Sequence, residues 1–179
     1  MRQIPDIQSL TSDAVELLKE MIAIPSPSFE EDAVCSHVSG WLSVHGVGHR
    51  RAGNNIIAEH IVDPAKPTLM LCAHIDTVSP SNEYSFDPYN PDHSKAAEVI
   101  GSEDIVPGLG SNDDGASVVS MIATFRYFIS SAINTDLILV LSCEEERSGV
   151  NGMTGLWGSA LCCAKKTNCA DTAIKVDYA

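Results

Sequence analysis

Positively charged residues are scarce in this sequence. Lys and Arg together number 11 against 24 Asp and Glu, which gives a formal net charge of −13 over 179 residues. Nucleic acids and anionic membrane surfaces are bound mainly through clusters of Lys and Arg, so this balance argues against both kinds of partner. We therefore expect a small molecule or a cation as the ligand.

The sequence also lacks any apolar run of about 18 residues, which argues against a membrane-spanning helix. No basic segment followed by an apolar one stands at the start, which argues against a secretory leader. These absences predict a cytoplasmic protein, whose six cysteines would be free thiols. The cysteines near the end lack the paired C-x-x-C spacing of a zinc ribbon; they are Cys162, Cys163 and Cys169.

Apolar segments are present in the number that one folded domain needs, since 44% of the residues are hydrophobic. Residues 68–73 and 137–141 are apolar on both faces, which is typical of central strands covered by helices on each side. Residues 55–60 alternate between apolar and polar, which predicts a strand near a sheet edge after a turn-rich stretch at 46–53.

Helical patterns surround these strands. Residues 12–24 carry an apolar stripe, and a second helix is expected over 28–44, where Ser28 and Glu31 have the spacing of a capping box. A third amphipathic segment follows Asp114. The order of elements predicts an α/β fold, a three-layer α/β/α domain around a mostly parallel central sheet that is incomplete at its C-terminal end.

Three acidic clusters adjoin these elements. His-Ile-Asp at 74–76 and Glu-Glu-Glu at 144–146 follow the two apolar strands, and Asn-Asp-Asp at 112–114 precedes the third helix. Open α/β sheets keep their ligand sites at the carboxyl ends of strands. An imidazole and several carboxylates suit a divalent cation such as zinc, so the clusters together predict a metal site.

Each cluster alone also has an ordinary explanation. An H-x-D triplet arises often by chance, Asp113 or Asp114 could cap a helix, and three consecutive glutamates could form a solvated turn. The combination at one sheet edge favours the metal site. His74 would then bind metal, Asp76 would orient the imidazole or a neighbouring group, and Asp113 could bridge two cations. One glutamate would hold metal while its neighbour acts as a general base.

The segments also resemble the M20 family of zinc metallopeptidases and deacylases, and most closely its acetylornithine deacetylase branch, which hydrolyses N-acyl amino acids. The resemblance extends over residues 10–152. The segments that carry it are Leu17-Leu18-Lys19 with Ile24-Pro25-Ser26-Pro27-Ser28, Asn54-Asn55-Ile56, Cys72-Ala73-His74-Ile75-Asp76-Thr77-Val78, Gly108-Leu109-Gly110-Ser111-Asn112-Asp113 and Ser142-Cys143-Glu144-Glu145-Glu146 with Ser148-Gly149.

The resemblance implies two zinc ions, for which cobalt could substitute, and assigns a role to each candidate residue. His74 would bind one ion, Asp113 would bridge both and Glu146 would bind the other. Glu145 would be the general base, and Asp76 would support the site behind His74. The implied reaction is hydrolysis of the amide bond of a small-molecule N-acyl amino acid by metal-activated water.

The chain departs from the family pattern at two places. Asp114 stands where this branch often has an uncharged residue. After residue 152 we find no counterpart of the family's Gly-Glu-Pro-like ligand segment, its lid and dimerisation domain or its late histidine, although the family forms homodimers. We therefore expect a partial catalytic domain over 1–152 and a divergent, frameshifted or truncated tail over 153–179. The alternatives are an inactive fragment that at most binds a divalent cation, and a di-zinc aminopeptidase.

Overall fold

The computed structural model describes residues 4–63, 65–92, 98 and 105–159. The strands form one four-stranded sheet in the order β1-β2-β4-β3. The elements in chain order are α1 (Ile7–Ile22), α2 (Asp32–Val44), β1 (His49–Ala52), β2 (Asn55–His60), β3 (Thr68–His74), the short helical segment η1 (Ser111–Ala116), α4 (Ser117–Ser130), β4 (Asp136–Ser142) and α5 (Met153–Ser159).

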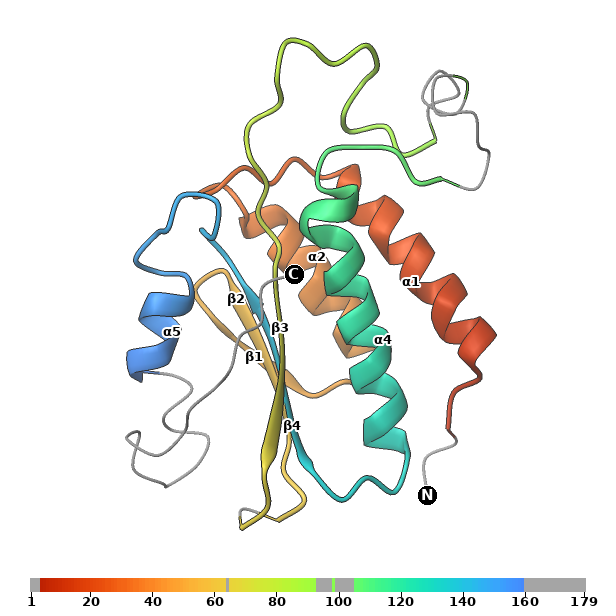
Figure 1. Ribbon diagram of the computed structural model, residues 1–179, viewed down its shortest axis with the longest axis vertical. Helices are drawn as coiled ribbons and strands as arrows, with labels where there is room; N and C mark the ends of the chain where they lie inside the picture. The colour runs from red at the N-terminus through yellow and green to blue at the C-terminus, as the bar shows by residue number, and fades with distance from the viewer. Residues whose placement is uncertain (1–3, 64, 93–97, 99–104, 160–179) are drawn as a thin grey trace.

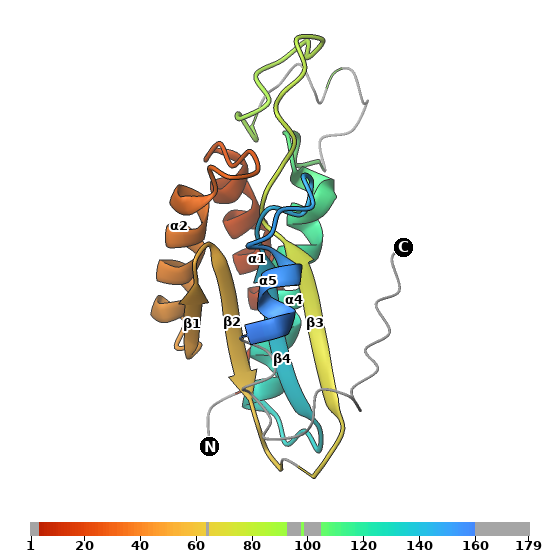
Figure 2. The same cartoon turned by 90° about the vertical axis from the view of Figure 1, so that its left-hand side faces the viewer.

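Helices cover both faces of this sheet. Helices α1, α2 and α4 lie against one face and α5 lies against the other, as Figures 1 and 2 show. Successive residues of a strand point to opposite faces; on β4, Leu139 packs with Val38 and Phe125 in the first core, and Val140 packs with Leu156 in the second. The three-layer α/β/α prediction is therefore confirmed, and β4 is buried along its whole length, as the apolar run predicted.

The strand directions differ from the prediction of a mostly parallel sheet. Among the strands of the described residues, only β3 and β4 pair in parallel, whereas β1 pairs with β2 and β2 with β4 in antiparallel directions. The reason is a hairpin that the sequence pattern did not reveal. Its first strand, β1, is the polar sequence His-Arg-Arg-Ala, and a two-residue turn begins with Gly53 at a φ of +61°. This hairpin puts β1 at the edge and β2 inside the sheet.

Strand β3 is the second difference, because it was expected at the centre of the sheet. Within the described residues its one neighbouring strand is β4, so β3 forms an edge. Leu69 on this strand is 48% exposed. An apolar run on both faces therefore did not distinguish a central strand from an edge strand.

The helix starts also differ from the predicted ones. Helix α1 begins at Ile7, because the Asp6 carboxylate accepts hydrogen bonds from the first N–H groups. Helix α2 begins at Asp32, and the predicted capping box does not form. The Ser28 hydroxyl donates instead to Asp76, and Glu31 turns its carboxylate towards other backbone groups. Tertiary partners have replaced the local ones.

The described cysteines, Cys35, Cys72 and Cys143, are free thiols, as predicted. Burial raises the pKa of Cys35 and Cys72 to about 11 and that of Cys143 to about 12. The remaining cysteines, and most of the predicted tail, lie outside the described residues; helix α5, which the sequence pattern did not predict, is its first part. In the described ranges, no helix has the length and apolar character needed to cross a membrane.

Candidate metal centre

Three potential metal ligands converge at one end of the sheet. His74 is the last residue of β3, Asp113 lies in η1, and Glu146 lies in the turn after β4. One donor atom from each of these side chains lies within 4.8 Å of the other two. The parallel pairing of β3 with β4 explains the convergence, because it puts the carboxyl ends of both strands at the same end of the sheet, at the top of Figure 1.

The His74 imidazole is surrounded by carboxylates. Its Nε2 lies 3.1 Å from Asp113 Oδ1 and 3.7 Å from Glu145 Oε2. Its Nδ1 lies 3.0 Å from the backbone oxygen of Asp76 and 3.5 Å from Asp76 Oδ1. Burial lowers the pKa of His74, but the hydrogen bonds and charge of Asp76 and the charge of Asp114 outweigh burial and raise it to about 9. Surroundings that stabilise an imidazolium in this way also favour a metal cation.

Asp76 is buried and connects the two strand ends. Its Oδ1 accepts a hydrogen bond from the backbone N–H of Glu145, and its Oδ2 accepts one from the N–H of Glu146, both at 3.1 Å. The Ser28 hydroxyl donates to the same Oδ2 at 2.7 Å. Burial raises the pKa of Asp76, but the hydrogen bonds from His74, Ser28 and the two backbone groups outweigh it and hold this pKa below its ordinary value. Asp76 is therefore an ionised carboxylate that orients its neighbours.

The other carboxylates of the site face outwards. The Asp113 side chain is 78% exposed and that of Glu145 is 48% exposed. Burial raises the pKa of Glu146, and the charge of Asp113 raises it further. Carboxylates held this close repel one another unless a cation lies between them. With one imidazole nitrogen in the same cluster, the donor set fits a divalent cation that accepts nitrogen and oxygen ligands.

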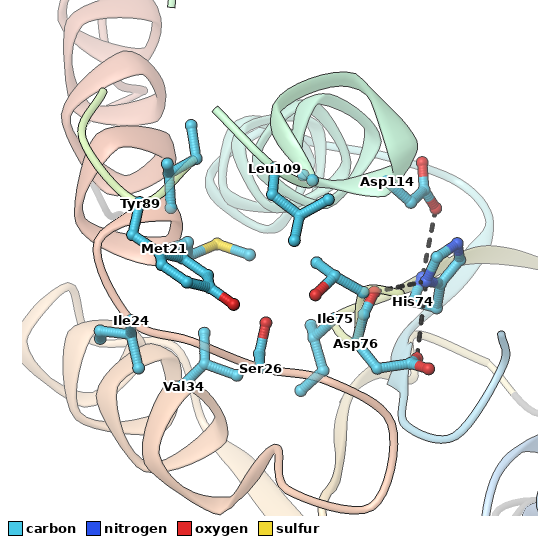
Figure 3. A pocket seen from close by; sticks show the side chains of 14 residues that line it. Met21, Ile24, Ser26, Val34, His74, Ile75, Asp76, Tyr89, Leu109 and Asp114 are labelled. Carbon is cyan, nitrogen blue, oxygen red and sulfur yellow. Dashed lines mark hydrogen bonds and ion pairs between the residues drawn. The ribbon is translucent and has the colours of Figure 1, made fainter. Parts of the chain in front are cut away.

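Asp114 does not simply face solvent. Its half-buried carboxylate accepts a hydrogen bond from the backbone N–H of His74 at 3.2 Å, and Figure 3 shows Asp114 and Asp76 on opposite sides of that histidine. The peptide bond between Asp113 and Asp114 is cis. Asp113 and Asp114 have non-helical backbone angles, and both side chains contact His74 instead of the first N–H groups of a helix. The helix-cap explanation of these two residues is therefore wrong.

A small cavity lies on the inner side of His74 (Figure 3). Its lining includes Met21, Tyr89 and Leu109, and its volume is about 20 Å³. A space of this size holds about one water molecule. A substrate would therefore approach the ligand cluster from the outer side, where Asp113 and Glu145 are exposed.

The sequence pattern did not predict which residues support the acidic turn at 144–146. Glu144 is buried and is not equivalent to the two glutamates that follow it, because its carboxylate accepts hydrogen bonds from the backbone and side chain of Asn151 at 3.0 and 2.8 Å. Asn55 accepts a hydrogen bond from the N–H of Cys143 at 3.0 Å. Glu31 accepts one from the N–H of Glu144. The sequence contained no signal for the two glutamates, because Glu31 stands between Glu30 and Asp32 and Glu144 begins a run of three glutamates. The spacing of a capping box offered a local explanation for Glu31.

Comparison with known proteins identifies a family that matches this chain. A family model described as Peptidase family M28 matches residues 55–178, a range that includes the strands of the site and the predicted tail. A probable carboxypeptidase of Emericella nidulans is 28% identical over 145 residues, which cover 77% of this chain and 32% of that protein. The chain thus spans about a third of the length of this curated relative.

Solved structures of a dipeptidase and of two M20 family peptidases share the fold. Human carnosine dipeptidase 1 aligns with a TM-score of 0.61 at 18% identity over 84% of this chain and 36% of that one. An M20 family metallo-carboxypeptidase from Sulfolobus solfataricus aligns with a TM-score of 0.61 at 18% identity, over 75% of this chain and 31% of that one. A dinuclear metal binding peptidase of the M20 family from Bacillus subtilis aligns with a TM-score of 0.60 at 14% identity, over 87% of this chain and 41% of that one.

The M20 resemblance of the motifs therefore extends to the fold, while the sequence match identifies the family. That match covers more than half of the chain and includes His74, Asp113 and Glu146. The chain belongs to peptidase family M28, a family of metal-dependent hydrolases.

Proposed function

We propose that this protein uses a divalent cation to hydrolyse an amide bond whose nitrogen belongs to an amino acid with a free carboxylate. The observation that carries the proposal is the convergence of His74, Asp113 and Glu146, with the Glu145 carboxylate beside them. An N-acyl amino acid such as N-acetylornithine, a dipeptide and the C-terminus of a peptide all contain this bond. The carboxypeptidase and dipeptidase names of the relatives support the same substrate class.

His74, Asp113 and Glu146 would hold the cation, and zinc suits their nitrogen and oxygen atoms. Asp113, the most exposed of these ligands, would share its carboxylate between two ions. The name of the dinuclear peptidase from Bacillus subtilis supports the second ion. When bound, the metal supplies a Lewis acid that polarises the amide carbonyl and lowers the pKa of water.

Glu145 would move the proton. Its side chain is half exposed on the open side of the site, 3.7 Å from His74 Nε2, while its backbone N–H is held by the buried Asp76. A carboxylate in this position can accept a proton from water and pass it to the departing amine nitrogen. The buried Glu144 cannot take this role because Asn151 engages both of its oxygens.

Glu145→Gln separates proton transfer from metal binding. With zinc or cobalt present, the chain should hydrolyse N-acetylornithine or a dipeptide, and this variant should lower kcat by roughly 10²–10⁴-fold. It should still bind cobalt, as measured by visible absorption. Glu146→Gln should lose cobalt affinity instead. Asp32→Asn is the control, because Asp32 is 80% exposed and lies outside the site.

The same assay distinguishes the alternatives. Cobalt binding without hydrolysis of any of these substrates would support the inactive-fragment interpretation. Faster cleavage of leucine p-nitroanilide than of N-acetylleucine would support the aminopeptidase, because the anilide has a free amine and no free carboxylate. Hydrolysis that survives in Glu145→Gln would remove that residue from the mechanism.

A further inference from the structure

The turn that carries the general base and a metal ligand is held by two buried carboxylates. Asp76 accepts the backbone N–H groups of Glu145 and Glu146. The preceding N–H, that of Glu144, donates to Glu31 Oε1 at 3.0 Å. Three consecutive N–H groups of this turn are therefore oriented by side chains from other parts of the chain. Glu31 has no role in the function proposed above.

Glu31 is itself fixed in place. It is completely buried, in the connection between α1 and α2. Its Oε1 also accepts the backbone N–H of Phe29 at 2.8 Å, and its Oε2 accepts the amide of Asn54 at 3.3 Å. Burying a carboxylate costs free energy unless hydrogen bonds compensate it. The donors around Glu31 provide that compensation and leave the carboxylate little freedom to move.

The bond to Glu144 acts at a backbone position that is unusual for a side-chain-bearing residue. Glu144 has a φ of +57°, in the left-handed region, and a non-glycine residue there costs free energy that the surroundings must offset. The hydrogen bond from its N–H to Glu31 and the one from the Gly149 N–H to its carbonyl oxygen, at 2.8 Å, hold this conformation. The direction in which the chain leaves Glu144 determines where Glu145 and Glu146 begin.

We infer that Glu31 is a positioning residue of the metal centre. By holding Glu144 in its left-handed conformation, it orients the turn that presents Glu145 and Glu146 to the site. This inference rests on the proposed function, because it assumes that the centre binds a cation. Groups that orient metal ligands typically change metal affinity about 10–100-fold when they are removed.

Two substitutions separate the reach of the Glu31 side chain from its charge. Glu31→Asp keeps the charge but is one methylene shorter, so its carboxylate no longer reaches the Glu144 N–H. Glu31→Gln keeps the length and one acceptor oxygen but loses the charge. Glu30→Gln is the matched control, since it removes one negative charge from the adjacent, exposed position. Circular dichroism checks that each full-length variant is folded.

Cobalt titration of the metal-free chain, followed by visible absorption below the unfolding temperature, measures the effect. Glu31→Asp should weaken cobalt binding about tenfold or more and change the absorption bands of bound cobalt. Glu31→Gln should weaken it by about threefold, because a neutral oxygen is a weaker acceptor. Glu30→Gln should bind as the unsubstituted chain does. A purely structural Glu31 would alter the thermal midpoint without moving the affinity or the spectrum.

Three results would overturn the inference. The first is unchanged cobalt affinity and spectrum in folded Glu31→Asp. The second is a larger loss in Glu31→Gln than in Glu31→Asp, or a loss of the same size in Glu30→Gln, either of which would indicate charge and not geometry. If Glu31→Asp does not fold, unchanged affinity and spectrum in Glu31→Gln would have the same effect. Absence of cobalt binding by the unsubstituted chain would instead contradict the proposed function itself.

Discussion

The buried carboxylate of Asp76 accepts a hydrogen bond from the backbone N–H of Glu145, a residue 69 positions later in the chain, at 3.1 Å. This bond joins the carboxyl end of β3 to the turn after β4. It gives Asp76 two tasks, because the same side chain lies against the His74 imidazole. The relative positions of a proposed ligand and the proposed general base therefore depend on one carboxylate.

Asp76→Asn should weaken metal binding more than it weakens the fold. The asparagine amide can present one oxygen, but its NH₂ group would face an N–H donor of Glu145 or Glu146, so one hydrogen bond is lost and the turn shifts. We expect a decrease in zinc affinity of about 10–100-fold. Competition with a coloured chelator measures it.

The control for this substitution is Asp32→Asn, which changes net charge equally at an exposed position. Equal zinc affinity in Asp76→Asn and Asp32→Asn would contradict the orienting role of Asp76.

Metal should stabilise the folded chain, because the cation would offset the repulsion between Asp113 and Glu146. At a free zinc concentration 100 times the dissociation constant, the gain in the free energy of unfolding is about 2.7 kcal/mol. Differential scanning calorimetry with zinc and with a chelator measures it as a change in thermal midpoint. Glu146→Gln should reduce this difference, and equal midpoints for the unsubstituted chain in both buffers would contradict the metal site.

The metal-free protein should lose stability between about pH 6.5 and 9 through His74. The pKa of His74 is raised in the folded state from an ordinary value of 6.5 to about 9, so the folded state binds this proton more tightly than the unfolded state. The resulting stabilisation is fully present below pH 6.5 and disappears as the pH rises through about 9. Urea unfolding of the chelator-treated chain at several pH values measures this loss.

The histidine responsible for this loss is identified by substitution. His74→Gln should remove this part of the pH dependence, whereas His37→Gln, on the surface of α2, should keep it. The same dependence in His74→Gln as in the unsubstituted chain would show that other groups cause it.

Leu69→Lys should reduce self-association. Leu69 is 48% exposed on β3, an edge of the described sheet, and a lysine on an edge strand opposes edge-to-edge pairing. The change in the free energy of unfolding should stay within about 0.5 kcal/mol, as is usual for exposed positions. Sedimentation velocity measures association. Val78→Lys is the charge control, since Val78 is 50% exposed but lies outside the strand; equal effects would indicate net charge.

The positions of β4 and of the acidic clusters could be derived from the sequence because local pattern determines them. An apolar run bounded by polar residues predicted β4, and the carboxylates follow where the run stops. Strand β1 could not be predicted, because its polar residues give no alternation. The direction of β2 and the edge position of β3 depend on which strands pair, and pairing is a long-range property.

The sequence by itself determined the composition of the candidate site: an imidazole and carboxylates placed at element ends, together with the chemistry of a divalent cation. Only the tertiary structure decided how those groups are held. Ser28 and Glu31 have the spacing of a local cap, yet they bind Asp76 and the backbone of Glu144, which are distant in the chain. Buried polar groups take whichever donors and acceptors the packed fold brings to them, and sequence spacing does not record those partners.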